Sequence, residues 1–126
     1  SPNLKYPPHN HNMATTIALC SGTESAAYFR LRQGQPQATV TRIYTAGDMV
    51  FLPADVIHAV GNPGTERSVA LHVYYGNLPV VHRSVWNSET GEALPFTDEN
   101  YFRLAQPLDP NQAYTPPDQT QWAATQ

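Results

Sequence analysis

Two short apolar runs set between turn residues make up residues 47–62, which read Gly47-Asp48-Met49-Val50-Phe51-Leu52-Pro53-Ala54-Asp55-Val56-Ile57-His58-Ala59-Val60-Gly61-Asn62. Runs of this length, bounded by glycine, proline and asparagine, are typical of β-strands. We predict strands at 48–52 and 57–60. The second of these would carry His58 into the body of the fold.

Similar runs on both sides of this stretch predict an all-β fold. Further strands are expected at 15–20, 26–32, 38–44, 68–75 and 80–86. Within 68–75, the apolar residues Val69, Leu71 and Val73 alternate with Ala70, His72 and Tyr74. The two sets should therefore face opposite sides of a sheet. Many short strands separated by turns indicate a sandwich or a barrel.

The C-terminal part of the chain has a different character. Residues 97–104 predict one short helix, capped by Thr97 or Asp98. From residue 106 onward Pro, Gln, Asp and Thr dominate, which is typical of an extended or disordered arm. We therefore expect a single domain over 1–105 and a Pro/Gln-rich tail over 106–126.

Composition argues against several classes of partner. The net charge of -3 and the lack of basic runs disfavour nucleic acid and anionic membranes. No apolar stretch approaches the roughly 18 residues of a membrane span. The single cysteine, Cys20, cannot form an internal disulfide, which fits a reducing compartment and predicts a cytoplasmic protein. We expect its thiol to be buried, and Phe51, Tyr75 and Trp86 to belong to the core.

Three of the five histidines form a pattern that suits a metal site. In His9-Asn10-His11, residues i and i+2 of a strand point to the same face, so both imidazoles can reach one ion. His58 would arrive from a distant strand and close one face of the metal. Three neutral imidazoles favour an anionic ligand in the open positions, and imidazole suits iron, zinc, nickel and copper alike. The alternative is a histidine-lined pocket without metal.

Residues 47–62 resemble the second cupin motif, G-x5-P-x-G-x2-H-x3-N. Gly47, Pro53, His58 and Asn62 occupy its fixed positions, and Asp55 stands where glycine is usual. Aspartate is a tolerable substitute at a turn because it adopts left-handed conformations more readily than most residues. The resemblance implies a cupin double-stranded β-helix, or jelly-roll barrel, followed by the short helix and the extended tail.

The segment around His9 is similar to the first cupin motif, H-x-H-x3-E-x6-G. His9, His11 and Gly22 match, whereas Thr15 takes the position of the usual glutamate. A cupin barrel normally has a strand ahead of this motif, and only eight residues precede His9. We therefore expect that edge of the sheet to be covered by an upstream segment, by the Pro-rich tail, or by a second subunit in a homodimer.

A cupin without that glutamate is similar to the thiol dioxygenases, which are the cysteine and 3-mercaptopropionate dioxygenases and their uncharacterised bacterial relatives. Here Ala70-Leu71-His72-Val73-Tyr74 resembles their S-x-H-x-Y trio beside the iron, with alanine in place of serine. The resemblance implies that Tyr74 donates a proton or hydrogen bond at the metal while His72 holds its hydroxyl. It also implies that Arg83 binds a substrate carboxylate, although a surface salt bridge with Glu89 or Glu92 is an alternative.

These observations lead to one functional hypothesis and two rivals. The leading hypothesis is a non-haem iron dioxygenase in which His9, His11 and His58 hold Fe²⁺ and a small thiol carboxylate, such as 3-mercaptopropionate, is oxidised with dioxygen. Zinc, nickel and manganese are alternative ions for the purified protein. One rival is another three-histidine chemistry, the carbon–carbon cleavage of a diketone or catechol-like substrate. The other is a non-enzymatic, ligand-binding cupin with a structural metal.

Overall fold

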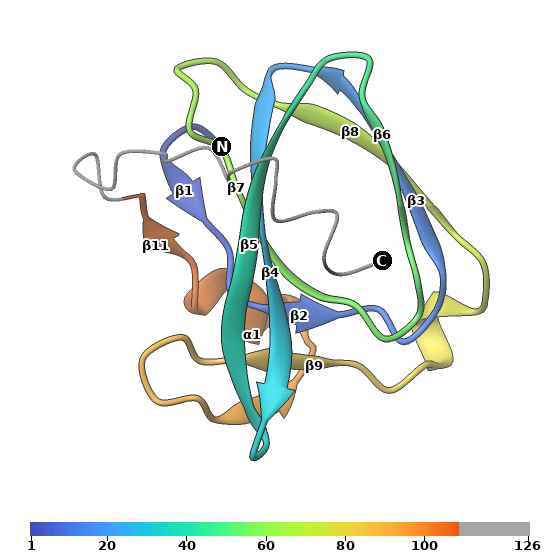
Figure 1. Cartoon of the computed structure of the whole chain (residues 1–126), viewed down its shortest axis with the longest axis vertical. Helices are drawn as coiled ribbons and strands as arrows, with labels where there is room; N and C mark the ends of the chain where they lie inside the picture. Colours follow the sequence, from blue (N-terminus) through green and yellow to red (C-terminus); the bar gives the residue numbers. More distant parts are fainter. Residues whose placement is uncertain (109–126) are drawn as a thin grey trace.

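The computed structural model describes residues 1–108 and consists of two antiparallel sheets with one short α-helix (Figure 1). The larger sheet is built around β7 (Ile57–Gly61), which pairs along one edge with β4 (Thr23–Arg32). β4 pairs in turn with β5 (Gln35–Thr45) in a long hairpin. The other edge of β7 pairs with β1 (Leu4–Lys5) and with β2 (His9–Asn10). Two segments far apart in sequence, around His9 and His58, are thereby brought together.

Short strands from the C-terminal part of the described chain complete the larger sheet. β9 (Ser84–Trp86) pairs with β2, and β10 (Ala93–Pro95) pairs with β9. β11 (Gln106–Pro107) pairs with β1. The helix α1 (Asp98–Arg103) precedes β11, and its N-terminus is capped by the Thr97 side chain, which accepts a hydrogen bond from the backbone N–H of Asn100.

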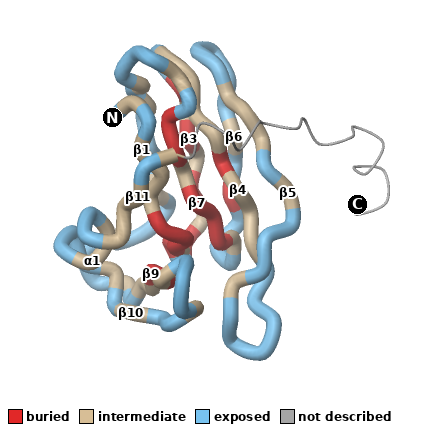
Figure 2. The backbone as a smooth tube through the Cα atoms, turned by 90° about the vertical axis from the view of Figure 1, so that its left-hand side faces the viewer, coloured by how far each residue is buried: buried red, intermediate tan, exposed pale blue. Residues whose placement is uncertain are grey.

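The smaller sheet has β3 (Thr15–Ser21) in the middle, with β6 (Met49–Leu52) and β8 (Val69–Tyr74) on its two sides. Along β3 the side chains alternate, so that Thr15, Ile17 and Leu19 are buried while the residues between them are partly exposed. The core lies between the inner faces of the two sheets, and Figure 2 shows the buried segments running along β3, β7 and β4. Its apolar members are Met13, Ile17, Leu19, Ala26, Leu52, Ile57, Ala59, Val85 and Trp86.

The structure confirms the all-β class and most of the predicted elements. Each strand predicted between residues 15 and 75 is present, with ends that shift by a few residues. The predicted helix at 97–104 is α1, and Thr97 rather than Asp98 is its cap. Trp86 is buried as expected. Turn residues and alternation were therefore sufficient to locate the central strands.

One strand prediction was wrong in its boundaries. The predicted strand at 80–86 begins only at Ser84, because the 3-10 helix η1 (Leu78–Val80) precedes it. Pro79 lies in the first turn of η1, where its fixed φ and missing N–H suit a helical turn and not a sheet ladder. The strands β1, β10 and β11 were not predicted, since two or three residues carry no detectable alternation. The strand expected across His9 and His11 is present as β2, which ends at Asn10.

Three burial predictions were wrong. Cys20 is exposed, and Phe51 and Tyr75 are exposed by 59% and 61%. Cys20 and Phe51 lie on the outer face of the smaller sheet, and no part of residues 1–108 covers them. Aromatic and sulfur-containing residues predict burial only when both faces of their sheet are covered, which is not so here.

The edge beside the first histidine segment is covered from within the chain. β1 precedes His9, and β11, formed by the first residues of the predicted Pro/Gln-rich tail, pairs with β1. Leu108 extends this contact by donating its N–H to the Asn3 carbonyl at 2.9 Å. The remainder of the predicted tail, 109–126, lies outside the described residues.

Within residues 1–108 no helix has the length and apolar character needed to cross a membrane.

Candidate metal centre

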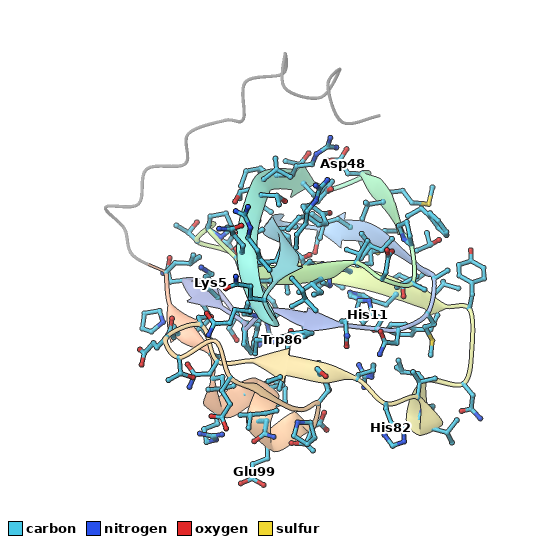
Figure 3. All side chains as sticks on the ribbon, turned by 60° about the horizontal axis from the view of Figure 1, so that its bottom comes forward. Lys5, His11, Asp48, His82, Trp86 and Glu99 are labelled. Carbon is cyan, nitrogen blue, oxygen red and sulfur yellow. The ribbon has the colours of Figure 1, made fainter. Side chains whose placement is uncertain are left out.

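The three predicted ligand histidines meet at the pairing of β2 with β7. His9 and His58 are direct cross-strand partners, and His11 follows one residue after the end of β2. One nitrogen from each imidazole lies within 4.8 Å of the others. All three side chains are buried, with exposures of 5%, 5% and 1% for His9, His11 and His58. In Figure 3 the labelled His11 lies in the interior, whereas His82 lies at the periphery.

The backbone just before His9 fixes the orientation of its ring. Pro7 and Pro8 are fully buried, and their fixed φ angles hold this segment extended. His9 Nδ1 lies 3.0 Å from the Pro7 carbonyl oxygen. A carbonyl can only accept a hydrogen bond, so Nδ1 carries the proton and Nε2 carries the lone pair. A backbone carbonyl holding one ring nitrogen is a common support for a histidine that binds metal through the other.

His58 supplies the test of whether the residues present fit a metal ion. Its Nε2 is the one buried side-chain nitrogen or oxygen atom within residues 1–108 that has no hydrogen-bond partner. Burying an unsatisfied polar atom costs about 1–3 kcal/mol, so such atoms are rare in native structures. A metal ion bound by the three imidazoles would satisfy this lone pair. The donor set of three clustered, buried imidazoles therefore fits a divalent transition metal.

Burial keeps all three imidazoles neutral at physiological pH. It lowers the pKa of His9 to about 4, against the opposing effect of its hydrogen bond to Pro7. Burial, followed by repulsion from His9, lowers the pKa of His11 to about 3. The same two causes hold the pKa of His58 well below its ordinary value. Neutral imidazole is the form that donates a lone pair to a metal, so the site needs no proton release to bind one at pH 7.

The metal-free protein should lose stability as pH falls from about 6.5 to about 4. The unfolded chain protonates its histidines near pH 6.5, whereas folded His9 resists protonation until about pH 4. The unfolded state therefore binds more protons in this window, and the free energy of unfolding falls as the solution is acidified. His9 alone should contribute a loss of up to about 3 kcal/mol.

Urea unfolding of the metal-free protein at several pH values between 7 and 4 measures this dependence. The exposed histidine variant His82→Ala should give the same profile as the wild type. An unfolding free energy that stays constant from pH 7 to pH 4.5 would show that the three imidazoles are not held neutral in the fold.

The two predicted residues of β8 face the histidines from the opposite sheet. The Tyr74 ring lies 5.4 Å from the His11 ring, measured between centroids. The Tyr74 hydroxyl lies 3.2 Å from His72 Nδ1, so the two side chains form a hydrogen-bonded pair. Burial raises the pKa of Tyr74, so its hydroxyl stays protonated at neutral pH. Thr15, at the position of the missing glutamate, is fully buried and lies directly opposite Tyr74 in the sheet.

Arg83 lies beside the histidine cluster. Its guanidinium carbon is 4.0 Å from the centroid of the Phe96 ring, and that ring lies 5.5 Å from the ring of His9. Burial is the main reason for the low pKa values of His9 and His11, and the positive charge of Arg83 lowers both further. Of the two acidic residues considered as alternative partners, Glu89 instead accepts a hydrogen bond from Gln106.

An aromatic cluster that was not predicted from the sequence packs against the histidines. Tyr101 of α1 stands edge-on to His9 at 5.2 Å and stacks on Tyr6 at 4.8 Å. On the other side, Tyr28 lies opposite His58 in the pairing of β4 with β7, and its hydroxyl is 2.8 Å from that of Tyr44. No sequence signal identified these residues, because their contacts depend on strand pairing and on the docking of α1.

Comparisons with known proteins add no family assignment. No protein-family model matches the sequence, and a search of curated proteins found no similar one. The residues of the site are three clustered neutral imidazoles, a protonated tyrosine paired with a histidine, and an arginine at the edge of the cluster.

Proposed function

We propose that this chain is a three-histidine cupin that binds Fe²⁺ and oxidises a small thiol carboxylate with dioxygen. Two observations together carry the proposal: one ring nitrogen from each of His9, His11 and His58 lies within 4.8 Å of the others, and the buried Nε2 of His58 has no hydrogen-bond partner within residues 1–108. His9, His11 and His58 would hold the Fe²⁺, and the bound ion would supply the activation of dioxygen that oxidation of a thiol needs. Both oxygen atoms would be added to sulfur, converting the thiol to a sulfinate.

The cupin jelly roll is part of the same proposal. It is supported by two facing antiparallel sheets and by the place of the histidines, which lie on β2, just after it, and on β7. The turn at the end of the second motif also fits. Asn62 is buried, its Oδ1 accepts a hydrogen bond from the Gly64 N–H at 2.9 Å, and its Nδ2 donates to the Glu66 carbonyl at 2.8 Å. This asparagine therefore closes the loop that follows the His58 strand.

Tyr74 and His72 are proposed to manage a proton beside the histidines. The raised pKa of Tyr74 keeps its hydroxyl as a donor, and His72 Nδ1 is placed to accept from it or to donate to it. Alanine at position 70 removes the third member of the trio, so the tyrosine hydroxyl has one side-chain partner there instead of two. His72 can thus orient the Tyr74 hydroxyl, and the missing second partner leaves that hydroxyl able to hydrogen-bond to a ligand.

Arg83 is proposed to bind the substrate carboxylate. A guanidinium over an aromatic ring keeps its N–H donors at the edge of its plane, where they can hold a carboxylate through two parallel hydrogen bonds. The thiol would then point toward the histidines, with the carboxylate at the Phe96 side of the site. This arrangement predicts that thiols without a carboxylate are poor substrates.

Oxygen consumption by the iron-loaded protein tests the proposal. We expect turnover with 3-mercaptopropionate or cysteine, little with cysteamine, and a product heavier than the substrate by two oxygen atoms. His58→Ala should abolish turnover, whereas His82→Ala should retain it. Iron binding without turnover of any thiol would contradict the proposal. Cleavage of a diketone or catechol would then support the rival chemistry, and no turnover at all would support a ligand-binding cupin.

A cytoplasmic location stays a prediction.

A further inference from the structure

The outer face of the smaller sheet is apolar and uncovered by residues 1–108. Six large side chains on β6, on β8 and just after β8 are strongly exposed. They are Met49 (71%), Phe51 (59%), Val69 (50%), Leu71 (60%), Val73 (44%) and Tyr75 (61%). We call this set the outer apolar face. It is the opposite side of the sheet from His72 and Tyr74, so it belongs to a different surface from the candidate metal centre.

Strand register joins these side chains into one patch. On the central strand, Thr16 lies directly between Phe51 and Val73, and Ala18 lies directly between Met49 and Leu71. The large side chains of the two outer strands therefore stand on either side of a row of small ones. The sheet order β6-β3-β8 places both outer strands at the edges of the sheet.

Two contacts hold the aromatic members of the patch in place. The Tyr75 hydroxyl lies 3.2 Å from Thr16 Oγ1, and the rings of Phe51 and Tyr75 are 6.4 Å apart in an edge-to-face arrangement. Ordered aromatic side chains lose little conformational entropy on association, which is one reason why they dominate the energetics of interfaces.

The composition and size of the patch match the core of a protein interface. The outward positions of the three strands hold no charged side chain, since those on β3 are Thr16, Ala18 and Cys20. Interface cores are depleted in charge and enriched in tyrosine, phenylalanine and methionine. A fully exposed aromatic residue can bury about 150–250 Å², and Phe51 and Tyr75 each still expose about 60% of their surface. With the other four side chains added, the patch can form the central part of the ~800 Å² that each partner contributes to a stable interface.

We propose that a second copy of this chain packs its outer apolar face against this one, forming a symmetric dimer. A two-fold interface brings the same surface together twice, and an uncharged surface does so without placing like charges opposite each other. The rows of large and small side chains can interdigitate across such an axis. The histidines lie in the other sheet, so dimer formation leaves the metal site as it is.

Sedimentation equilibrium of the full chain tests the proposal. A dimer has twice the chain mass of 13.9 kDa. Leu71→Glu places one unpaired charge from each copy in the interface, and we expect it to weaken the dimer by at least about 100-fold. The matched control is Leu31→Glu at the end of β4, where a leucine of similar exposure, 51%, lies away from the face. This variant should dimerise like the wild type.

A second measurement uses the single cysteine, which lies on the same side of the smaller sheet as the outer apolar face. A spin label on Cys20 should report one label-to-label distance in the dimer and none after Leu71→Glu. Circular dichroism and metal binding, which should match the wild type, confirm that each variant is folded. A wild-type chain that stays monomeric at high concentration would overturn the proposal. Equal weakening by Leu31→Glu would overturn it too.

Discussion

Replacing His58 with alanine should weaken Fe²⁺ binding by more than about 100-fold, because even the loss of a residue that only supports a metal ligand costs about 10–100-fold. His58 is 1% exposed and its Nε2 has no hydrogen-bond partner within residues 1–108, which leaves the lone pair of this atom for the proposed metal. The variant would leave two imidazoles, and a divalent ion held by two neutral ligands is far more weakly bound. Competition with a fluorescent chelator measures the affinity directly.

His82→Ala is the matched control for this prediction. His82 is exposed, and its backbone carbonyl accepts a hydrogen bond from the Asn12 side chain. Its variant should bind Fe²⁺ like the wild type. If both variants bind Fe²⁺ equally well, the metal lies elsewhere and the histidine cluster is a buried polar group without that role.

Arg83→Ala should raise KM for a thiol carboxylate by roughly 10- to 1000-fold, which corresponds to about 1.5–4 kcal/mol for a lost charged hydrogen-bond partner. The guanidinium lies 4.0 Å from the Phe96 ring centroid, beside His9, so its removal should affect the carboxylate end of the substrate and not the reacting thiol.

By contrast, Tyr74→Phe removes only the hydroxyl paired with His72, and we expect it to lower kcat more than it raises KM.

Steady-state oxygen consumption separates these two effects. Arg103→Ala is a suitable control, because Arg103 is an exposed residue of α1 whose side chain contacts Asn100. Unchanged kinetics in Arg83→Ala, or a preference for cysteamine over 3-mercaptopropionate, would remove Arg83 from the substrate site. The metal-binding prediction for His58 would be unaffected by that result.

The fold was predictable from sequence where strands were long enough to show alternation. β3 to β8 each have four or more residues bounded by turns, and all were located. Alternation cannot be detected in strands as short as β1, β2, β10 and β11, which have two or three residues. These strands form because they hydrogen-bond to neighbouring strands. A local sequence pattern also does not predict which strands pair with each other. The sequence therefore could not show that the smaller sheet has one uncovered face, which is why Cys20 and Phe51 were wrongly expected to be buried.

The histidine cluster was predictable from two local patterns. One is the short spacing of His9 and His11, and the other is the turn-bounded strand that contains His58. The i, i+2 spacing predicted that His9 and His11 would approach one ion, although β2 ends at Asn10 and His11 follows it, and His58 lies in the strand that pairs with His9. The supporting residues were not predictable. Tyr101 reaches His9 from a helix nearly the length of the described chain away, and Tyr28 faces His58 across a strand pairing. Such contacts depend on the packing of the whole fold.

X-ray absorption spectroscopy of the iron-loaded protein tests whether the three histidines hold the metal. We expect a mononuclear site with three imidazole nitrogens at about 2.0–2.2 Å, the distance typical of histidine ligands. The imidazole scattering should be lost in His58→Ala and retained in His82→Ala. A protein that takes up no metal, or a bound ion surrounded by oxygen ligands without imidazole scattering, would contradict it.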